Sequence, residues 1–143
     1  MSEFDFDDMN REVLAEFRAN GGVVDTAAGG YFKGKPMVVL HTRGAKTGTE
    51  RVNPLMYLDE GDRRYVFASK GGAPNHPDWY HNLKANPDVT VETGTDSYPA
   101  TAREITGSER DRIYAAQAAA WPQFGEYEEK TTRKIPVVAL DRS

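Results

Sequence analysis

The sequence predicts a small α+β barrel, and three observations lead to this prediction. The apolar, β-branched segments are short, tight glycine turns join them in pairs, and helical segments do not alternate with strands one by one. Antiparallel strand pairs with helices inserted late in the chain are typical of a small barrel, whereas strict alternation would predict a parallel sheet. The chain fits one domain, because no internal repeat or low-complexity linker divides residues 1–143.

The N-terminal 30 residues are expected to form a helix and a loop. Apolar residues recur at helical spacing from Met9 to Phe17, and Asp7 or Asp8 can cap this helix. Residues 20–22 (Asn-Gly-Gly) supply a stop signal, because both residue types tolerate the left-handed conformation at a helix end. A glycine-bearing loop then leads to the first strand.

Three strands joined by two tight turns are expected next. Residues 36–43 and 51–58 are rich in apolar and β-branched side chains on either side of a turn at 44–48. After a second turn at 60–62, residues 64–69 alternate as a half-buried strand. Short glycine turns favour antiparallel neighbours, so these segments predict a meander.

The remaining elements complete the predicted barrel. A short helix is expected within residues 76–87, because its His-Pro-Asp start suits a first helical turn, and a hairpin follows at 89–93 and 97–103. Threonine and glutamate at the first and fourth positions of 106–120 predict a capping box that opens an alanine-rich helix. Residues 135–140 are the last expected strand. The total is about six strands with three or four peripheral helices.

The charge distribution suggests a small anionic ligand. The formal net charge is -4, yet the first 25 residues alone carry seven acids and two bases, whereas residues 26–49 carry four bases and no acid. A local cationic stretch on an acidic chain favours a small anion over a nucleic acid, because duplex binding usually requires a strongly basic domain. The same cations are also compatible with an ordinary solvated surface.

Several classes of site are not expected. The chain has no cysteine, which excludes disulfides and thiolate chemistry, and its three histidines lack the spacing of a metal site. The longest apolar runs are four or five residues, and a membrane span needs about 20. The acidic start is unlike a secretory leader, and the acidic first helix lacks the basic face of a membrane-surface anchor. We therefore expect a cytoplasmic protein without stable membrane insertion.

Two basic, glycine-bearing segments are candidates for holding the anion. Near the first turn, Lys46 and Arg51 could clamp an anionic oxygen, and the order Lys-Thr-Gly followed by a strand excludes a nucleotide-type phosphate loop. After the third strand, residues 69–72 (Ser-Lys-Gly-Gly) combine a hydroxyl, a cation and two glycines, which let the backbone approach a ligand closely. A polar hairpin tip and a mobile surface loop are the alternatives for these two segments.

The order of three motifs closely resembles the deazaflavin-dependent nitroreductase family, whose members use coenzyme F420 and are known from mycobacteria and related actinobacteria. The motifs lie in Gly44–Leu55 (GAKTG, then RVNPL), Ala68–Gly72 (ASKGG) and Pro77–Pro87 (PDWYHNLKANP). The similarity runs from about Gly30 to Leu140 and includes RKIPVV at 133–138. The resemblance implies a split β-barrel related to flavin-binding reductases, which agrees with the strands expected above.

The resemblance also implies where the cofactor binds. The cofactor-binding residues are expected to be Lys46, Thr47, Gly48, Arg51, Asn53, Pro54, Leu55, Ala68, Ser69, Lys70, Gly71, Gly72, Trp79 and Asn82. Those in the two glycine segments would hold the phosphate and glutamate tail, residues 53–55 would border the deazaflavin ring, and the others would complete the pocket. A tail of phosphate and carboxylates requires cations and main-chain amides, which these segments supply.

The implied activity is F420H2-dependent transfer of a hydride to a quinone, enone or nitroaromatic acceptor. Ser69 and Tyr127 are the candidate catalytic residues, because a hydroxyl is needed to stabilise or protonate the reduced acceptor. Phe124 and Tyr127 are the candidates for substrate binding. Phe124 stands where the best-known member of the family has a substrate-side tyrosine, and the lost hydroxyl counts against activation of bicyclic nitroimidazole prodrugs.

Two alternatives remain open, a non-catalytic F420-binding or carrier protein and an FMN-binding split-barrel reductase. The carrier would keep the cofactor residues while Phe124 lacks a proton donor, and the FMN protein would share the barrel. A nucleic-acid-binding barrel is a more remote option. The expected partner is a small-molecule electron acceptor, and the expected state is a monomer or weak homodimer.

Overall fold

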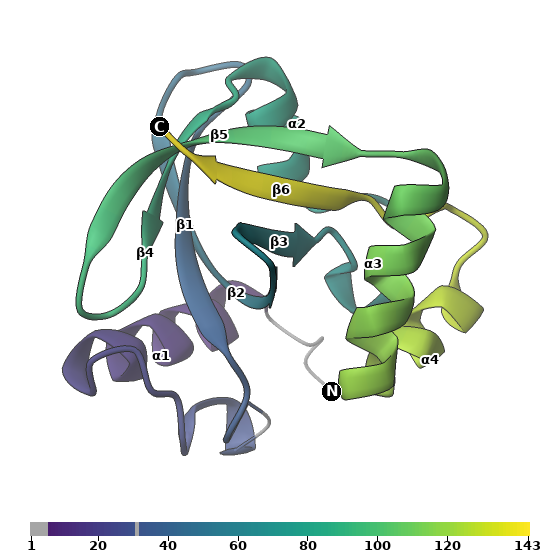
Figure 1. The fold of residues 1–143 in the computed structure, drawn as a ribbon. Helices are drawn as coiled ribbons and strands as arrows, with labels where there is room; N and C mark the ends of the chain where they lie inside the picture. Colours follow the sequence, from purple (N-terminus) through teal and green to yellow (C-terminus); the bar gives the residue numbers. More distant parts are fainter. Residues whose placement is uncertain (1–5, 31) are drawn as a thin grey trace.

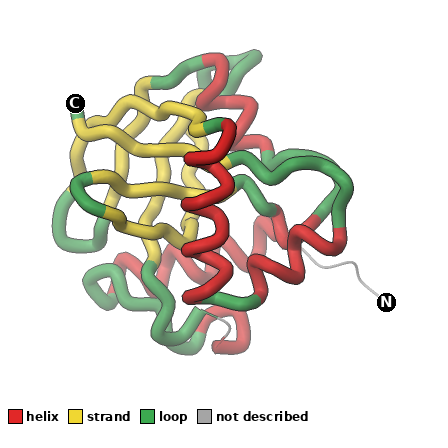
Figure 2. The backbone as a smooth tube through the Cα atoms, turned by 45° about the vertical axis from the view of Figure 1, so that its right-hand side comes forward, coloured by secondary structure: helices red, strands yellow, loops and turns green. Residues whose placement is uncertain are grey.

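The computed structural model describes residues 6–30 and 32–143, and these contain the antiparallel barrel that the sequence predicts. The strands are β1 (Met37–Arg43), β2 (Glu50–Glu60), β3 (Arg63–Phe67), β4 (Asp88–Glu92), β5 (Ser97–Ile105) and β6 (Val137–Arg142). They close in the order β1-β2-β3-β6-β5-β4, with every neighbouring pair antiparallel. Figure 2 shows the strands as one curved sheet with the helices on its outside.

Four α-helices in the described residues surround the barrel, which confirms the expected three or four. They are α1 (Phe6–Ala19), α2 (Asp78–Ala85), α3 (Gly107–Ala120) and α4 (Gln123–Lys130), and two 3-10 turns, η1 (Ala27–Gly30) and η2 (Lys70–Gly72), lie in loops. In Figure 1, α3 and α4 lie together on one flank of the barrel, and α1 lies apart from them below β1.

Two apolar clusters form the core, and they use alternate residues of the same strands. All six strands contribute to the first, here called the interior cluster, which α2 closes with Trp79 and Leu83. The second, here called the outer cluster, packs the other face of β1, β3 and β6 against α1, α3 and α4. Both faces of these strands are therefore buried, which explains the unbroken apolar runs at 37–40 and 137–140.

The ends of three elements differ from the predictions. Asp7 and Asp8 are not caps, because α1 already includes Phe6 and both residues lie within the helix. The capping box of α3 is not formed. Thr106 is the N-cap residue without a side-chain capping bond, and Glu109 instead lies 3.6 Å from the Arg63 guanidinium. β3 ends at Phe67, so residues 68 and 69 begin the following loop.

Candidate functional site

The β1–β2 turn, residues 44–49, is fastened to α2 by one buried amide side chain. Asn82 Oδ1 accepts the Ala45 N–H at 3.0 Å, and Asn82 Nδ2 donates to Thr42 Oγ1 at 3.3 Å. Asn82 is only 8% exposed, so these bonds are shielded from solvent. Lys46 lies exposed at the tip of this turn, as do Thr47 and Gly48. The structure thus assigns Asn82 a clear role in holding the turn that carries Lys46.

The loop after β3, residues 68–76, is organised around the guanidinium of Arg133. Arg133 lies in the segment between α4 and β6 and donates to three carbonyls, Ala68 O at 3.0 Å, Ser69 O at 2.7 Å and Ala73 O at 2.9 Å. Its Nη1 also lies 2.9 Å from His76 Nδ1. Sequence reasoning gave Arg133 no role, although it is the first residue of the RKIPVV motif.

Lys70 has an unusual backbone conformation inside this loop. Its φ of 47° makes it the one non-glycine residue with a positive φ among those described. Such a conformation is uncommon for a lysine and persists where the surroundings enforce it. The Lys70 ammonium lies 3.5 Å from Asn75 Oδ1, within the same loop. The backbone of the loop is therefore held in a specific conformation at Lys70.

Gly72 marks the place where α4 approaches the loop. A Cβ added to Gly72 would lie 3.0 Å from the carbonyl oxygen of Tyr127 and 3.0 Å from Cβ of Lys130, at a φ of +82°. Glycine is thus required here both for the contact and for the backbone angle. The contact brings the element that carries Tyr127 against the loop that carries Ser69. These are the two predicted catalytic residues, and both are half-buried.

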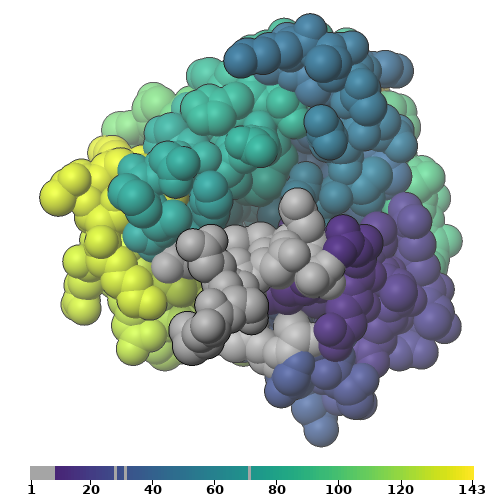
Figure 3. Space-filling model, turned by 180° about the vertical axis from the view of Figure 1, so that it is seen from behind, coloured from purple at the N-terminus to yellow at the C-terminus, as the bar shows by residue number. Residues whose placement is uncertain are grey.

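The two basic segments lie on the same side of the molecule. In Figure 3, slate-blue residues near 45 and teal residues near 70–80 adjoin each other on one face. α2 lies between them. Its Asn82 binds the first segment, and the second segment ends at His76, two residues before α2, where Arg133 contacts the His76 ring. The two segments therefore share a face of the molecule, and their joint role in binding an anion stays a prediction.

Residues 53–55 lie in β2 and pair with β1, with Asn53 opposite Leu40 and Leu55 opposite Val38. The pairing of β2 with β3 begins only at Tyr57. Within the described chain, the second edge of β2 at 53–55 therefore has no strand partner. Pro54 is buried, and Asn53 and Leu55 are half-buried. This unpaired stretch of strand edge is consistent with the predicted place of a planar ring.

Three of the predicted pocket residues have buried side chains. Ala68 and Trp79 are 0% and 5% exposed and belong to the interior cluster, so Trp79 packs as core. Phe124 is 4% exposed and makes edge-on ring contacts with Phe67, Tyr114 and Tyr127 at centroid distances of 5.6, 6.3 and 5.2 Å. Phe124 thus supports the outer cluster, and its part in substrate binding stays a prediction.

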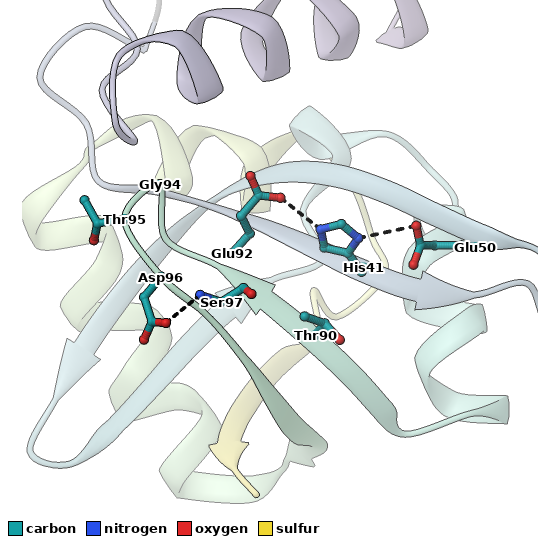
Figure 4. Close-up of a pocket in the computed structure, with 8 residues that line it drawn as sticks. All are labelled: His41, Glu50, Thr90, Glu92, Gly94, Thr95, Asp96 and Ser97. Atoms are coloured by element: carbon teal, nitrogen blue, oxygen red, sulfur yellow. Dashed lines mark hydrogen bonds and ion pairs between the residues drawn. The ribbon is translucent and has the colours of Figure 1, made fainter.

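A separate polar pocket lies along β1 and β4. It is lined by His41, Glu50, Thr90, Glu92, Gly94, Thr95, Asp96 and Ser97, none of which was predicted as a site residue (Figure 4). His41 lies between two carboxylates, with Nε2 3.0 Å from Glu92 and Nδ1 3.6 Å from Glu50. Among the described residues, no group of three or more histidines and acids could hold a metal ion.

α1 is tied to the barrel beside this pocket. Arg18 binds Glu92 through two bonds of 3.0 and 3.1 Å, and these bonds are the main reason that the pKa of Glu92 is lowered. Glu16 accepts the amides of residues 25–27, which lowers its pKa to about 2. Both acids are therefore structural anchors.

No helix in residues 6–30 or 32–143 has the length and apolarity for a membrane crossing.

Comparisons with known proteins identify the family and support the fold. The family model for F420H(2)-dependent quinone reductases matches residues 9–142. An F420H(2)-dependent quinone reductase of Mycobacterium tuberculosis H37Rv is 40% identical over 115 residues, which is 75% of this chain and 74% of that protein. A solved F420-H2 dependent reductase, FDR-A, is 42% identical with a TM-score of 0.68, over 83% of this chain and 97% of its own.

A second solved relative, described as a domain-swapped dimer, has a TM-score of 0.70 and 39% identity over 92% of this chain and 96% of its own. The predictions of a split-barrel fold, of coenzyme F420 and of an oxidoreductase are confirmed by the family match and the solved relatives. The chain belongs to the F420H(2)-dependent quinone reductase family.

Proposed function

We propose that the chain transfers a hydride from F420H2 to a quinone and holds the anionic tail of the cofactor between the β1–β2 turn and the 68–76 loop. One observation supports this proposal above the others, namely that Asn82 of α2 binds the β1–β2 turn while the 68–76 loop leads directly into α2 on the same face of the molecule. The family match supports the reaction, and the position of both segments beside α2 supports this location for the cofactor tail.

The residues present fit an anionic cofactor. Lys46 and Arg51 are exposed, and Lys70 stands beside two glycines in a constrained loop. In the part of the chain that the structure describes, none of these three cations forms an ion pair with a carboxylate, so their charge is available to a ligand. Phosphate and carboxylate groups gain the most from such donors, because charge-assisted hydrogen bonds are the stronger ones.

The chain's own part in the reaction is to bind, orient and shield. The reduced deazaflavin supplies the hydride, so the protein needs no nucleophile of its own. The unpaired edge of β2 at 53–55 offers main-chain groups against which a planar ring can be oriented. Negative charge develops on the quinone oxygen, and Ser69 and Tyr127 are the hydroxyls proposed to donate to it. The contact of α4 with η2 supports this pairing.

The test is anaerobic mixing of the protein with F420H2 and menadione, with loss of reduced cofactor as the measurement. We expect turnover, and we expect the double variant Lys46→Ala/Arg51→Ala to raise the KM for F420H2 while Arg103→Ala leaves it unchanged. Arg103 is a matched control, because it is an exposed arginine paired with Asp141 on β6. Tight F420 binding without turnover on quinones, enones and nitroaromatics would instead support a carrier, and preference for FMN would refute the cofactor assignment.

We also infer that the chain is a monomer or a weak homodimer. The dimer is supported by the solved relative that is described as domain-swapped. Light scattering during size-exclusion chromatography over a dilution series distinguishes these states, and a dimer that persists at the lowest concentration would contradict the inference.

A further inference from the structure

Arg133 contacts the proposed tail loop through nearly its whole guanidinium group. Three of its bonds go to main-chain carbonyls, at Ala68, Ser69 and Ala73, and the fourth contact is to His76 Nδ1. These four acceptors lie 57 to 65 positions from Arg133 along the chain. An arginine has five N–H donors in a rigid fork, so one side chain contacts the loop at four residues.

The charge of Arg133 is not cancelled by a protein carboxylate. Among residues 6–30 and 32–143, no acid forms an ion pair with Arg133. Burial lowers the pKa of the Arg133 guanidinium, which is the sign expected for a cation without a counter-ion. Two further cations lie nearby, because Lys70 is in the same loop and Lys130 packs against Gly72.

The bonds to Ala68 and Ser69 also set the direction of the loop's amides. Every peptide bond that the structure describes is trans, so the C=O of one residue and the N–H of the next point to opposite sides. Because the carbonyls of Ala68 and Ser69 point at Arg133, the N–H groups of Ser69 and Lys70 point away from it. The same bonds flank Lys70, whose backbone has the positive φ, and help to enforce it.

We propose that Arg133 is the positioning residue of the cofactor-tail site, which turns the amides of residues 69 and 70 outward and adds an uncompensated positive charge behind them. This inference rests on the proposed function. Arg133 acts through the loop and does not itself touch the cofactor. Arg133 should therefore raise the affinity for polyanionic ligands and leave the affinity for the neutral deazaflavin ring unchanged.

The experiment compares Arg133→Gln and Arg133→Lys with the control Lys134→Gln. Lys134 is an adjacent cation whose ammonium pairs with Asp111 at 3.4 Å on α3, away from the loop. We expect Arg133→Gln to weaken F420H2 binding about tenfold or more, the scale of a charged hydrogen bond, with kcat nearly unchanged. Arg133→Lys should recover part of the loss, because it keeps the charge without the fork. Lys134→Gln should bind as the original protein does.

Two further readouts separate this role from a merely structural one. A deazaflavin without the phosphate and glutamate tail should bind all four proteins equally, and the salt dependence of F420 affinity should be shallower in Arg133→Gln. Equal loss for the tailed and tail-free ligands, or no recovery in Arg133→Lys, would overturn the inference. If Arg133→Gln does not fold, Arg133→Lys carries the same ligand comparison. Failure of the original protein to bind F420 would refute the proposed function itself, whereas original-like binding by Arg133→Gln refutes only the role of Arg133.

Discussion

Replacing Phe124 with alanine should lower the free energy of unfolding by about 4 kcal/mol, because the structure places this ring in the outer cluster. Phe124 is 4% exposed and makes edge-on contacts with three rings, at Phe67, Tyr114 and Tyr127. Truncation of a buried phenylalanine costs about 3–5 kcal/mol, and each ring pair adds about 0.5–1.5 kcal/mol beyond area, without full additivity. The upper half of that range is therefore expected.

The assay for this prediction is equilibrium unfolding in urea, followed by tryptophan fluorescence and circular dichroism. Phe124→Leu is the matched variant, since it keeps apolar volume and removes only the ring, and it should cost about 1–2 kcal/mol. A loss below about 1 kcal/mol for Phe124→Ala, together with a raised KM for the quinone, would refute the core placement and favour a ring that faces substrate. The measurement thus decides between the structural role and the predicted substrate-binding role of Phe124.

Three further predictions concern single anchors. Asn82→Leu should lower the free energy of unfolding by about 1–3 kcal/mol, because it leaves the Thr42 hydroxyl, which is 2% exposed, without its hydrogen-bond partner. Asn82→Asp keeps the oxygen that accepts from Ala45 and should lose less stability. Urea titrations measure both changes. Glu16→Gln should flatten the pH dependence of stability between about pH 4.5 and 2, because the lowered pKa gives a contribution that is lost as pH falls through that window. The pKa of His76 is lowered, by burial first and by Arg133 next, so protonation of His76 below the usual value of 6.5 opposes folding. Below pH 6.5 the Tm of the original protein should therefore fall more steeply with pH than that of His76→Asn. Parallel plots of Tm against pH for the two proteins would contradict this prediction.

The strands could be predicted because their signals are local. Tight glycine turns and short apolar runs fix which segments pair, and the observed β1–β2 and β4–β5 hairpins join sequence neighbours. α4 was not assigned from residues 123–130, since the segment contains a glycine and has one buried residue, Phe124. Its helix depends on that ring's contacts with Phe67 and Tyr114. Most residues of α4 are good helix formers, but its glycine and short length leave the helix undecided without distant packing.

Some residues of the candidate site could likewise be predicted from the sequence, and others could not. Lys46 and Lys70 could be singled out because a cation beside glycines is visible in the sequence. The function of Arg133 could not, because its acceptors are carbonyls 60 to 65 positions away and a histidine 57 away. Glu109 shows the opposite error, since its local signal indicated a cap while Arg63 is its actual ion-pair partner. Hydrogen bonds and ion pairs between residues that are far apart in the sequence depend on the fold, and they produce no periodic pattern in the sequence.

α2 links the two halves of the site, and this has a measurable consequence. Leu83 is 2% exposed and anchors α2 in the interior cluster, so Leu83→Ala should cost about 2–5 kcal/mol. Because Asn82 holds the β1–β2 turn and the other loop ends at His76, two residues before α2, a loosened α2 should release both. Hydrogen exchange should therefore accelerate together at the hydrogen-bonded amides of Ala45 and Ala73 in Leu83→Ala, but only at Ala45 in Asn82→Leu. Faster exchange at one segment alone in Leu83→Ala would mean that the two cationic segments are held independently, and α2 could not then set the spacing between them.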